Sequence, residues 1–231
     1  MLLEIAKNSS FIQNIVVNIM TGIHPSIMHN LGKIEIIKKA MWNCELEQVE
    51  GGYFEFGVYE GTSLYAAVKA HKKIKSVVKR NFYGFDSFDE GFKYFDKRDE
   101  HPFFKEGDFV SSYEKTKKRF AKIHNVKLVK GYFEETVVGD KGKAISGNDT
   151  CAIVFIDCDL MGPSVVALEY VAPLLREGSI IIIDDYYAYK GREDLGPYGA
   201  FQSFLENHKN IKAREFSDYG YGGKSFIVTA C

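Results

Sequence analysis

Residues 53–63, YFEFGVYEGTS, decide the fold of this chain. The apolar run from Tyr53 to Gly57 predicts a strand, and the amphipathic run that follows Gly61 predicts a helix over residues 62–71. Two glycines lie where the backbone must turn sharply between these elements. Because ligands of open α/β sheets usually contact the first strand-to-helix turn, this turn predicts a cofactor-binding site.

Short apolar runs alternate with longer amphipathic runs from Tyr53 onward, which is typical of crossover units in a mostly parallel sheet. We therefore expect a Rossmann-like α/β fold. A glycine-rich turn at 218–223 predicts a hairpin that makes the last strand antiparallel. Further strands are predicted at 81–85, 126–129, 152–156, 179–183, 211–216 and 224–228, and further helices at 110–123, 164–176 and 198–208.

Residues 1–45 form the first of two predicted parts of the chain. Helices are expected at 3–20 and 30–43, separated by a turn that contains Gly22 and Pro25. We expect this segment to pack on the core of one domain formed by residues 46–231. The two helices are also candidates for a contact across the axis of a homodimer.

The composition favours a small-molecule partner over a charged surface. With 30 basic and 31 acidic residues and a net charge of −1, nothing favours nucleic acid or an anionic membrane. The 4 cysteines lack disulfide or zinc spacing, and the N-terminus lacks an export signal, so we expect reduced thiols and a cytoplasmic location. The 6 scattered histidines are interpreted as surface or packing residues.

The residues around the glycine turn indicate which class of cofactor it binds. A dinucleotide site needs G-x-G-x-x-G, whose third glycine is absent here. Glu55 precedes the turn and gives E-x-G-x-x-x-G, a pattern associated with S-adenosylmethionine, whose ammonium and sulfonium are positive. Asp86 ends the second predicted strand, close to the interval at which such folds place a carboxylate on ribose. The alternative is a tight turn over a buried, paired glutamate.

Four aspartates follow two buried strands. Asp157 and Asp159 close one strand and point to the same side, and Asp184 and Asp185 close the next. Neighbouring parallel strands would gather these carboxylates at one edge, where they need a cation; oxygen ligands favour a hard ion such as Mg²⁺. Such a site could activate a hydroxyl, but the residues leave open which aspartate is ligand and which is base. Loop capping is the alternative role.

The chain resembles the macrocin O-methyltransferase (TylF-like) family from about Gly51 to about His208. The matching stretches are FEFGVYEGTSL, FDSF at 85–88, GDF at 107–109, GYFEET at 131–136, FIDCDL at 155–160 and IIIDDYY at 181–187. The resemblance implies a class I methyltransferase sheet and Mg²⁺-dependent methylation of a sugar hydroxyl, with S-adenosylmethionine as donor. The stretches 160–164 and 187–198 depart from the family pattern.

The resemblance also implies roles for single residues. Asp157, Asp184 and Asp185 would bind the metal, and Asp159 would be the general base. Asp157 would take part in catalysis and also lie beside the cofactor. The predicted cofactor site consists of Glu55, Gly57, Gly61, Thr62, Ser63, Asp86, Ser87, Tyr132 and Phe133, with the two aromatic residues near the adenine.

Two other functions are compatible with the sequence. One is a nicotinamide-dependent oxidoreductase, which the missing glycine and the acidic cluster count against. The other is a non-catalytic cofactor-binding or scaffold protein, which the cost of gathering four acids counts against. Residues 87–109, aromatic and charged without periodicity, predict either a lid or a surface excursion. The sequence does not name the acceptor.

Overall fold

Seven strands form one sheet in the computed structural model of the chain, which describes residues 9–231. They are β1 (Gly52–Phe56), β2 (Phe82–Asp86), β3 (Val126–Lys130), β4 (Cys151–Ile156), β5 (Leu175–Ile183), β6 (Lys212–Tyr219) and β7 (Gly223–Ala230). Their order is β3-β2-β1-β4-β5-β7-β6, and β7 runs antiparallel to both neighbours. The predicted Rossmann-like fold with an antiparallel last strand is confirmed.

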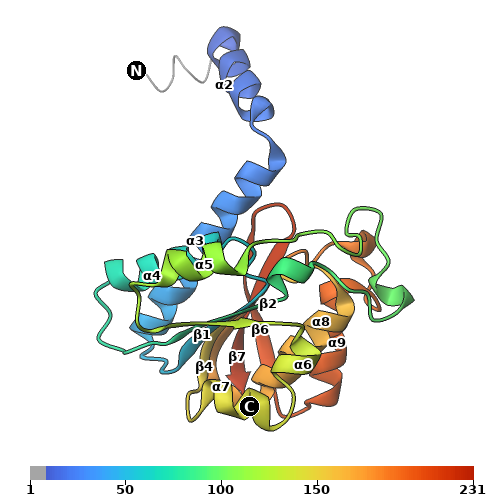
Figure 1. Cartoon of the computed structure of the whole chain (residues 1–231). Helices are drawn as coiled ribbons and strands as arrows, with labels where there is room; N and C mark the ends of the chain where they lie inside the picture. Colours follow the sequence, from blue (N-terminus) through green and yellow to red (C-terminus); the bar gives the residue numbers. More distant parts are fainter. Residues whose placement is uncertain (1–8) are drawn as a thin grey trace.

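Helices cover both faces of this sheet (Figure 1). One layer contains α3 (Pro25–Leu46), α4 (Thr62–Lys73) and α5 (Tyr113–Phe120). The other contains α6 (Phe133–Thr136), α7 (Asp140–Ser146), α8 (Met161–Val171) and α9 (Gly196–Asn207). Short 3-10 turns lie at η1 (Phe88–Glu90), η2 (Lys97–Asp99), η3 (Ala172–Leu174) and η4 (Tyr189–Gly191).

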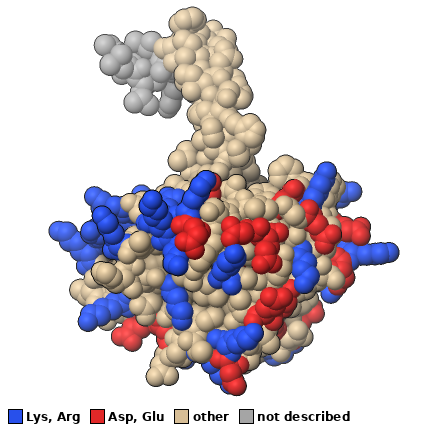
Figure 2. Space-filling view, viewed as in Figure 1, with Lys and Arg blue, Asp and Glu red and all other residues tan. Residues whose placement is uncertain are grey.

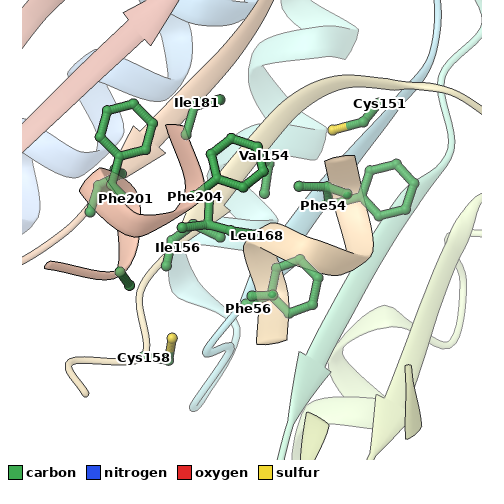
Figure 3. Packing of buried hydrophobic residues seen from close by; sticks show 14 of the residues in the cluster. Phe54, Phe56, Cys151, Val154, Ile156, Cys158, Leu168, Ile181, Phe201 and Phe204 are labelled. Atoms are coloured by element: carbon green, nitrogen blue, oxygen red, sulfur yellow. The ribbon is translucent and has the colours of Figure 1, made fainter. Parts of the chain in front are cut away.

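Strand β4 is apolar throughout because it contributes side chains to hydrophobic clusters on both faces of the sheet. Val154 and Ile156 belong to the core cluster that includes residues of α8 and α9 (Figure 3). Ile153 and Phe155 belong to the opposite cluster, with residues of α3 and α4. Because successive side chains of a strand point to opposite faces and both faces of β4 are covered, every position of β4 contacts an apolar core.

Several helix bounds differ from the predicted ones. α3 begins at Pro25 because the side chain of His24 accepts a hydrogen bond from the Ser26 amide, and proline suits a first helical turn. α5 begins only after Ser112, whose hydroxyl accepts from the Lys115 amide. Two further helices, α6 and α7, are not predicted from the sequence, because with 4 and 7 residues they are too short to show a helical period.

The first described helix, α2 (Ser10–Gly22), does not pack on the domain as expected for residues 1–45. None of its residues is buried, and it projects away from the sheet (Figure 1). α3 alone has buried residues in this segment. Part of the helix predicted at 3–20 lies outside the described residues. Across residues 9–231, no helix is long and apolar enough to cross a membrane.

Candidate active site

A cavity of about 660 Å³ lies at the carboxyl ends of β1, β4 and β5. The chain continues from β1 to β2 on one side, whereas β4 and β5 extend the sheet on the other. Such a switch in strand order leaves a crevice in which open α/β sheets bind ligands. The cavity walls come from the glycine turn, the residues after β4 and β5, α3, and the segment 91–109.

The glycine turn begins at a residue that admits no side chain. Gly57 has a φ of +93°, and a Cβ added there would lie 1.7 Å from the carbonyl oxygen of Asp157. Asp86 fixes the turn from below, because its Oδ2 accepts hydrogen bonds from the amides of Val58 at 2.7 Å and Tyr59 at 2.8 Å. Asp86 also lines the cavity, so the predicted ribose ligand is a structural residue of the turn as well.

Glu55 lies beneath the cavity rather than on its wall. Its side chain is fully buried, with Tyr53 donating to Oε2 at 2.6 Å and Ser63 donating to Oε1 at 2.8 Å. Burial raises the pKa of Glu55 to about 7, although both hydrogen bonds oppose the shift. Gly61 likewise lies outside the wall, at the start of α4. Glu55 therefore reaches the cavity only through Ser63, which lines it.

The other predicted cofactor residues surround the same cavity. Thr62, Ser63 and Ser87 line it next to the glycine turn. Tyr132 and Phe133 line it after β3, where the ring of Phe133 packs edge-on against Phe56 at 5.2 Å between centroids. The cavity thus combines a polar turn with an aromatic side wall.

All four predicted aspartates line the cavity. Asp157, Asp184 and Asp185 each offer one ligand oxygen, and these oxygens lie within 4.8 Å of one another. Asp159 and Asp185 have positive φ values of 59° and 48°, a strained conformation typical of functional sites. Burial raises the pKa of Asp159 well above its usual value, and the nearby Asp185 and Asp157 carboxylates add to the shift.

Two residues of α3 contact the aspartates, and neither is among the predicted site residues. Lys33 Nζ lies 2.9 Å from Asp157 Oδ2 and 2.7 Å from Asp184 Oδ2, and His29 Nε2 lies 3.0 Å from Asp184 Oδ1. The interpretation of His29 as a surface or packing residue holds only in part: its ring does stack on Tyr219, but it also contacts an aspartate of the cluster. The spacing of four residues between His29 and Lys33 places them on one helix face, which is the signal that could have found them.

These contacts set the charges of Lys33 and Asp184, whereas burial holds the pKa of Asp157 well above its usual value although Lys33 opposes that shift. Burial lowers the pKa of Lys33, but Asp157 and Asp184 outweigh it and hold that pKa well above its usual value. Burial raises the pKa of Asp184, but Lys33 and His29 outweigh it and hold that pKa far below its usual value. The hydroxyl of Tyr219 also donates to Asp184 Oδ1 at 2.8 Å. Asp184 is thus a charged carboxylate held by three donors.

The segment 91–109 contributes an aromatic wall to the same cavity. Phe92, Phe95, Phe103 and Phe109 all line the cavity. Asp99 anchors the segment, because its Oδ1 accepts from the Gly162 amide at 2.8 Å and its carbonyl accepts from the Tyr189 hydroxyl at 3.0 Å. The two stretches that depart from the family pattern therefore support this wall, and the segment is no mere surface excursion.

A model of the macrocin O-methyltransferase (TylF) family matches residues 25–213. The chain belongs to the macrocin O-methyltransferase family. The match begins at the start of α3, well before the resemblance that we identified from Gly51, so it includes His29 and Lys33. No curated protein sequence matches this macrocin O-methyltransferase family member significantly.

Solved methyltransferase structures share the fold. The O-methyltransferase NovP superposes with a TM-score of 0.64 at 19% identity, covering 86% of this chain and 80% of NovP. The calicheamicin methyltransferase CalS11 gives 0.62 at 20% identity, covering 98% of this chain and 89% of CalS11. PaMTH1 of Podospora anserina, bound to S-adenosylhomocysteine, gives 0.51 at 15% identity over 82% of this chain and 76% of its own.

Proposed function

We propose that this macrocin O-methyltransferase family member transfers a methyl group from S-adenosylmethionine to a hydroxyl of a sugar or a glycosylated small molecule. One observation carries the proposal: a single cavity is lined by the glycine turn after β1 and by the four aspartates after β4 and β5. A methyl donor and a hydroxyl acceptor could therefore lie side by side. A second CalS11 structure is described as a TDP-rhamnose 3'-O-methyltransferase, which favours a sugar acceptor.

The cofactor would occupy the side of the cavity next to β1 and β2. Asp86 Oδ1 accepts from the Phe88 amide and would use its remaining lone pair for a ribose hydroxyl, and Tyr132 and Phe133 would contact the adenine. Ser63 would lie near the positive amino-acid end, with the Glu55 carboxylate behind it. Gly57, Gly61 and Thr62 would shape the turn, and Ser87 and Asp157 would complete the site.

The carboxylate oxygens of Asp157, Asp184 and Asp185 fit Mg²⁺ or another hard divalent ion in number, kind and spacing. A bound ion would lower the pKa of an acceptor hydroxyl. Asp159 would take the proton from that hydroxyl, because it lines the same cavity beside the three candidate metal ligands. Phe92, Phe95, Phe103 and Phe109 would supply the apolar surface that small-molecule sites usually offer beside a few polar groups.

We further propose that the protein forms a homodimer through α2. Phe11, Val16 and Ile19 are 72%, 53% and 60% exposed, although each is apolar. Figure 2 shows the projecting segment without a basic or acidic side chain on the visible face. Light scattering of the full chain should give the dimer mass, and a chain lacking residues 1–22 should give the monomer mass. Cytoplasmic location stays a prediction from composition.

The function is tested by transfer of a labelled methyl group from S-adenosylmethionine to a panel of nucleotide sugars and glycosides. We expect at least one labelled product with Mg²⁺, no product with EDTA, and product formation slowed by about 10²-fold to 10⁴-fold in Asp159→Asn. The control Asp140→Asn, whose side chain is fully exposed, should match the native chain. Tight binding of a nicotinamide dinucleotide without binding of S-adenosylhomocysteine would contradict the proposal.

A further inference from the structure

The acidic cluster already contains a cation from its own chain. Lys33 Nζ donates to both oxygens of Asp157, at 3.0 Å and 2.9 Å, and contacts Asp184 Oδ2 at 2.7 Å. The remaining oxygen of Asp184 faces His29 and Tyr219. Every carboxylate oxygen of Asp157 and Asp184 therefore has a donor, and two of the three candidate metal ligands are occupied.

The backbone of α3 fixes Lys33 in this place. A Cβ added to Gly32 would lie 2.5 Å from the amide nitrogen of Gly220, so α3 and the β6–β7 turn touch through backbone atoms. The Tyr221 amide donates to His29 Nδ1 at 3.1 Å. This bond links the β6–β7 turn to α3 at a second point, one helical turn before Lys33. Ile36 and Ile37 are buried one turn further along. The backbone at Lys33 is thus fixed beside the cluster by packing, and only the Lys33 side chain can move away.

An ammonium and a divalent ion would compete for these oxygens. Both would lie within contact distance of the same carboxylates, and two positive charges so close repel strongly in a partly buried site. Lys33 also lines the cavity, which offers its flexible side chain space to move into. We infer that Lys33 is a resident cation that holds Asp157 and Asp184 in place and must be displaced when a divalent ion binds. The inference rests on the metal site of the proposed function.

The inference predicts that removing the Lys33 charge tightens metal binding. Calorimetric titration with Mn²⁺ in the presence of S-adenosylhomocysteine compares the native chain with Lys33→Met and Lys33→Arg. We expect Lys33→Met to bind Mn²⁺ about tenfold more tightly or better, because the competing charge is gone. Lys33→Arg keeps the charge and should not gain affinity. Lys38→Met, on an exposed position of α3, controls for net charge and should bind like the native chain.

Each outcome separates this inference from the proposed function. Equal Mn²⁺ affinity of the native chain and Lys33→Met would overturn the inference and leave the metal site standing. No Mn²⁺ binding in any variant would overturn both the inference and the metal part of the proposal, whereas binding of S-adenosylhomocysteine in the same cell would still support the cofactor site. Equal gains in Lys33→Met and Lys38→Met would also overturn it, because the effect would then be one of net charge.

Lys33→Met leaves two carboxylates without their cation and could fail to fold. A second measurement therefore uses the native chain. In the native chain labelled with ¹⁵N-lysine, the half-buried, ion-paired Lys33 ammonium should give a slowly exchanging NMR signal without metal. Saturating Mg²⁺ should remove or strongly shift this signal. A Lys33 ammonium signal that stays unchanged at saturating Mg²⁺ would contradict displacement.

Discussion

A Cβ on Gly57 would lie 1.7 Å from the carbonyl oxygen of Asp157. This contact joins the turn that would hold the cofactor to the strand end that begins the acidic cluster. The distance between the two half-sites is therefore set by backbone packing between β1 and β4, and it does not depend on any flexible side chain.

Gly57→Ala should destabilise the protein strongly. The new methyl group meets backbone, which cannot move aside, and the positive φ adds strain, so we expect a loss of ~3 kcal/mol or more in the free energy of unfolding. Gly139→Ala is the matched control, because Gly139 also has a positive φ but no atom within 4 Å of its added Cβ. Urea unfolding measures both. Equal losses would show that the close approach to Asp157 is unimportant.

Asp86→Ala should weaken binding of S-adenosylhomocysteine by about tenfold or more, because the Val58 and Tyr59 amides lose a charged acceptor and the ribose loses a partner. Asp86→Asn keeps one acceptor oxygen and should lose less. Asp140→Ala, an exposed aspartate, should bind like the native chain. Calorimetry gives the three affinities. Unchanged binding by Asp86→Ala would rule out its predicted role.

Glu55 should make stability depend on pH. Its pKa is raised from 4.5 to about 7, so the native state holds a proton that the unfolded state has lost, and stability falls as pH rises between these values. The shift corresponds to ~3 kcal/mol at most, at about 1.4 kcal/mol per unit. Glu55→Gln cannot ionise, so its stability relative to the native chain should increase from pH 5 to pH 8. A constant difference in unfolding free energy across that range would contradict this prediction.

Substituting Asp159 should lower the rate of methyl transfer, whereas substituting Asp185 should weaken metal binding. Asp159→Asn should lower the rate of methyl transfer by about 10²-fold to 10⁴-fold, because the base is lost, while Mn²⁺ still binds. Asp185→Asn should weaken Mn²⁺ binding itself. Transfer rates at saturating cofactor and Mn²⁺ titrations distinguish the two variants. Loss of Mn²⁺ binding in Asp159→Asn alone would reverse the roles.

The acidic cluster could be predicted because it depends on strand order and register. Ile156 of β4 pairs with Ile183 of β5, so the next residues, Asp157 and Asp184, become neighbours. Two continuously apolar strands, each followed by a pair of acids, contain this information. The same local logic predicted the glycine turn and the antiparallel β7.

The rest of the site depends on contacts that a local pattern does not contain. His29 and Lys33 share a helix face, but the rotation of α3 over the sheet is set by the contact between Gly32 and Gly220. Glu55 sits in a strand whose two faces are both buried, so its alternation with apolar residues did not reveal that it points beneath the cavity. Whether α2 packs depends on partners that no segment of residues 9–231 supplies.

The most direct test of the central claim is a crystal structure of the protein grown with S-adenosylhomocysteine and Mn²⁺, with Mn²⁺ located by its anomalous signal. We predict the cofactor over the turn from Gly57 to Ser63 and one Mn²⁺ among Asp157, Asp184 and Asp185. Cofactor bound elsewhere, or no cofactor in the cavity at saturating concentration, would contradict a methyltransferase site at this edge of the sheet.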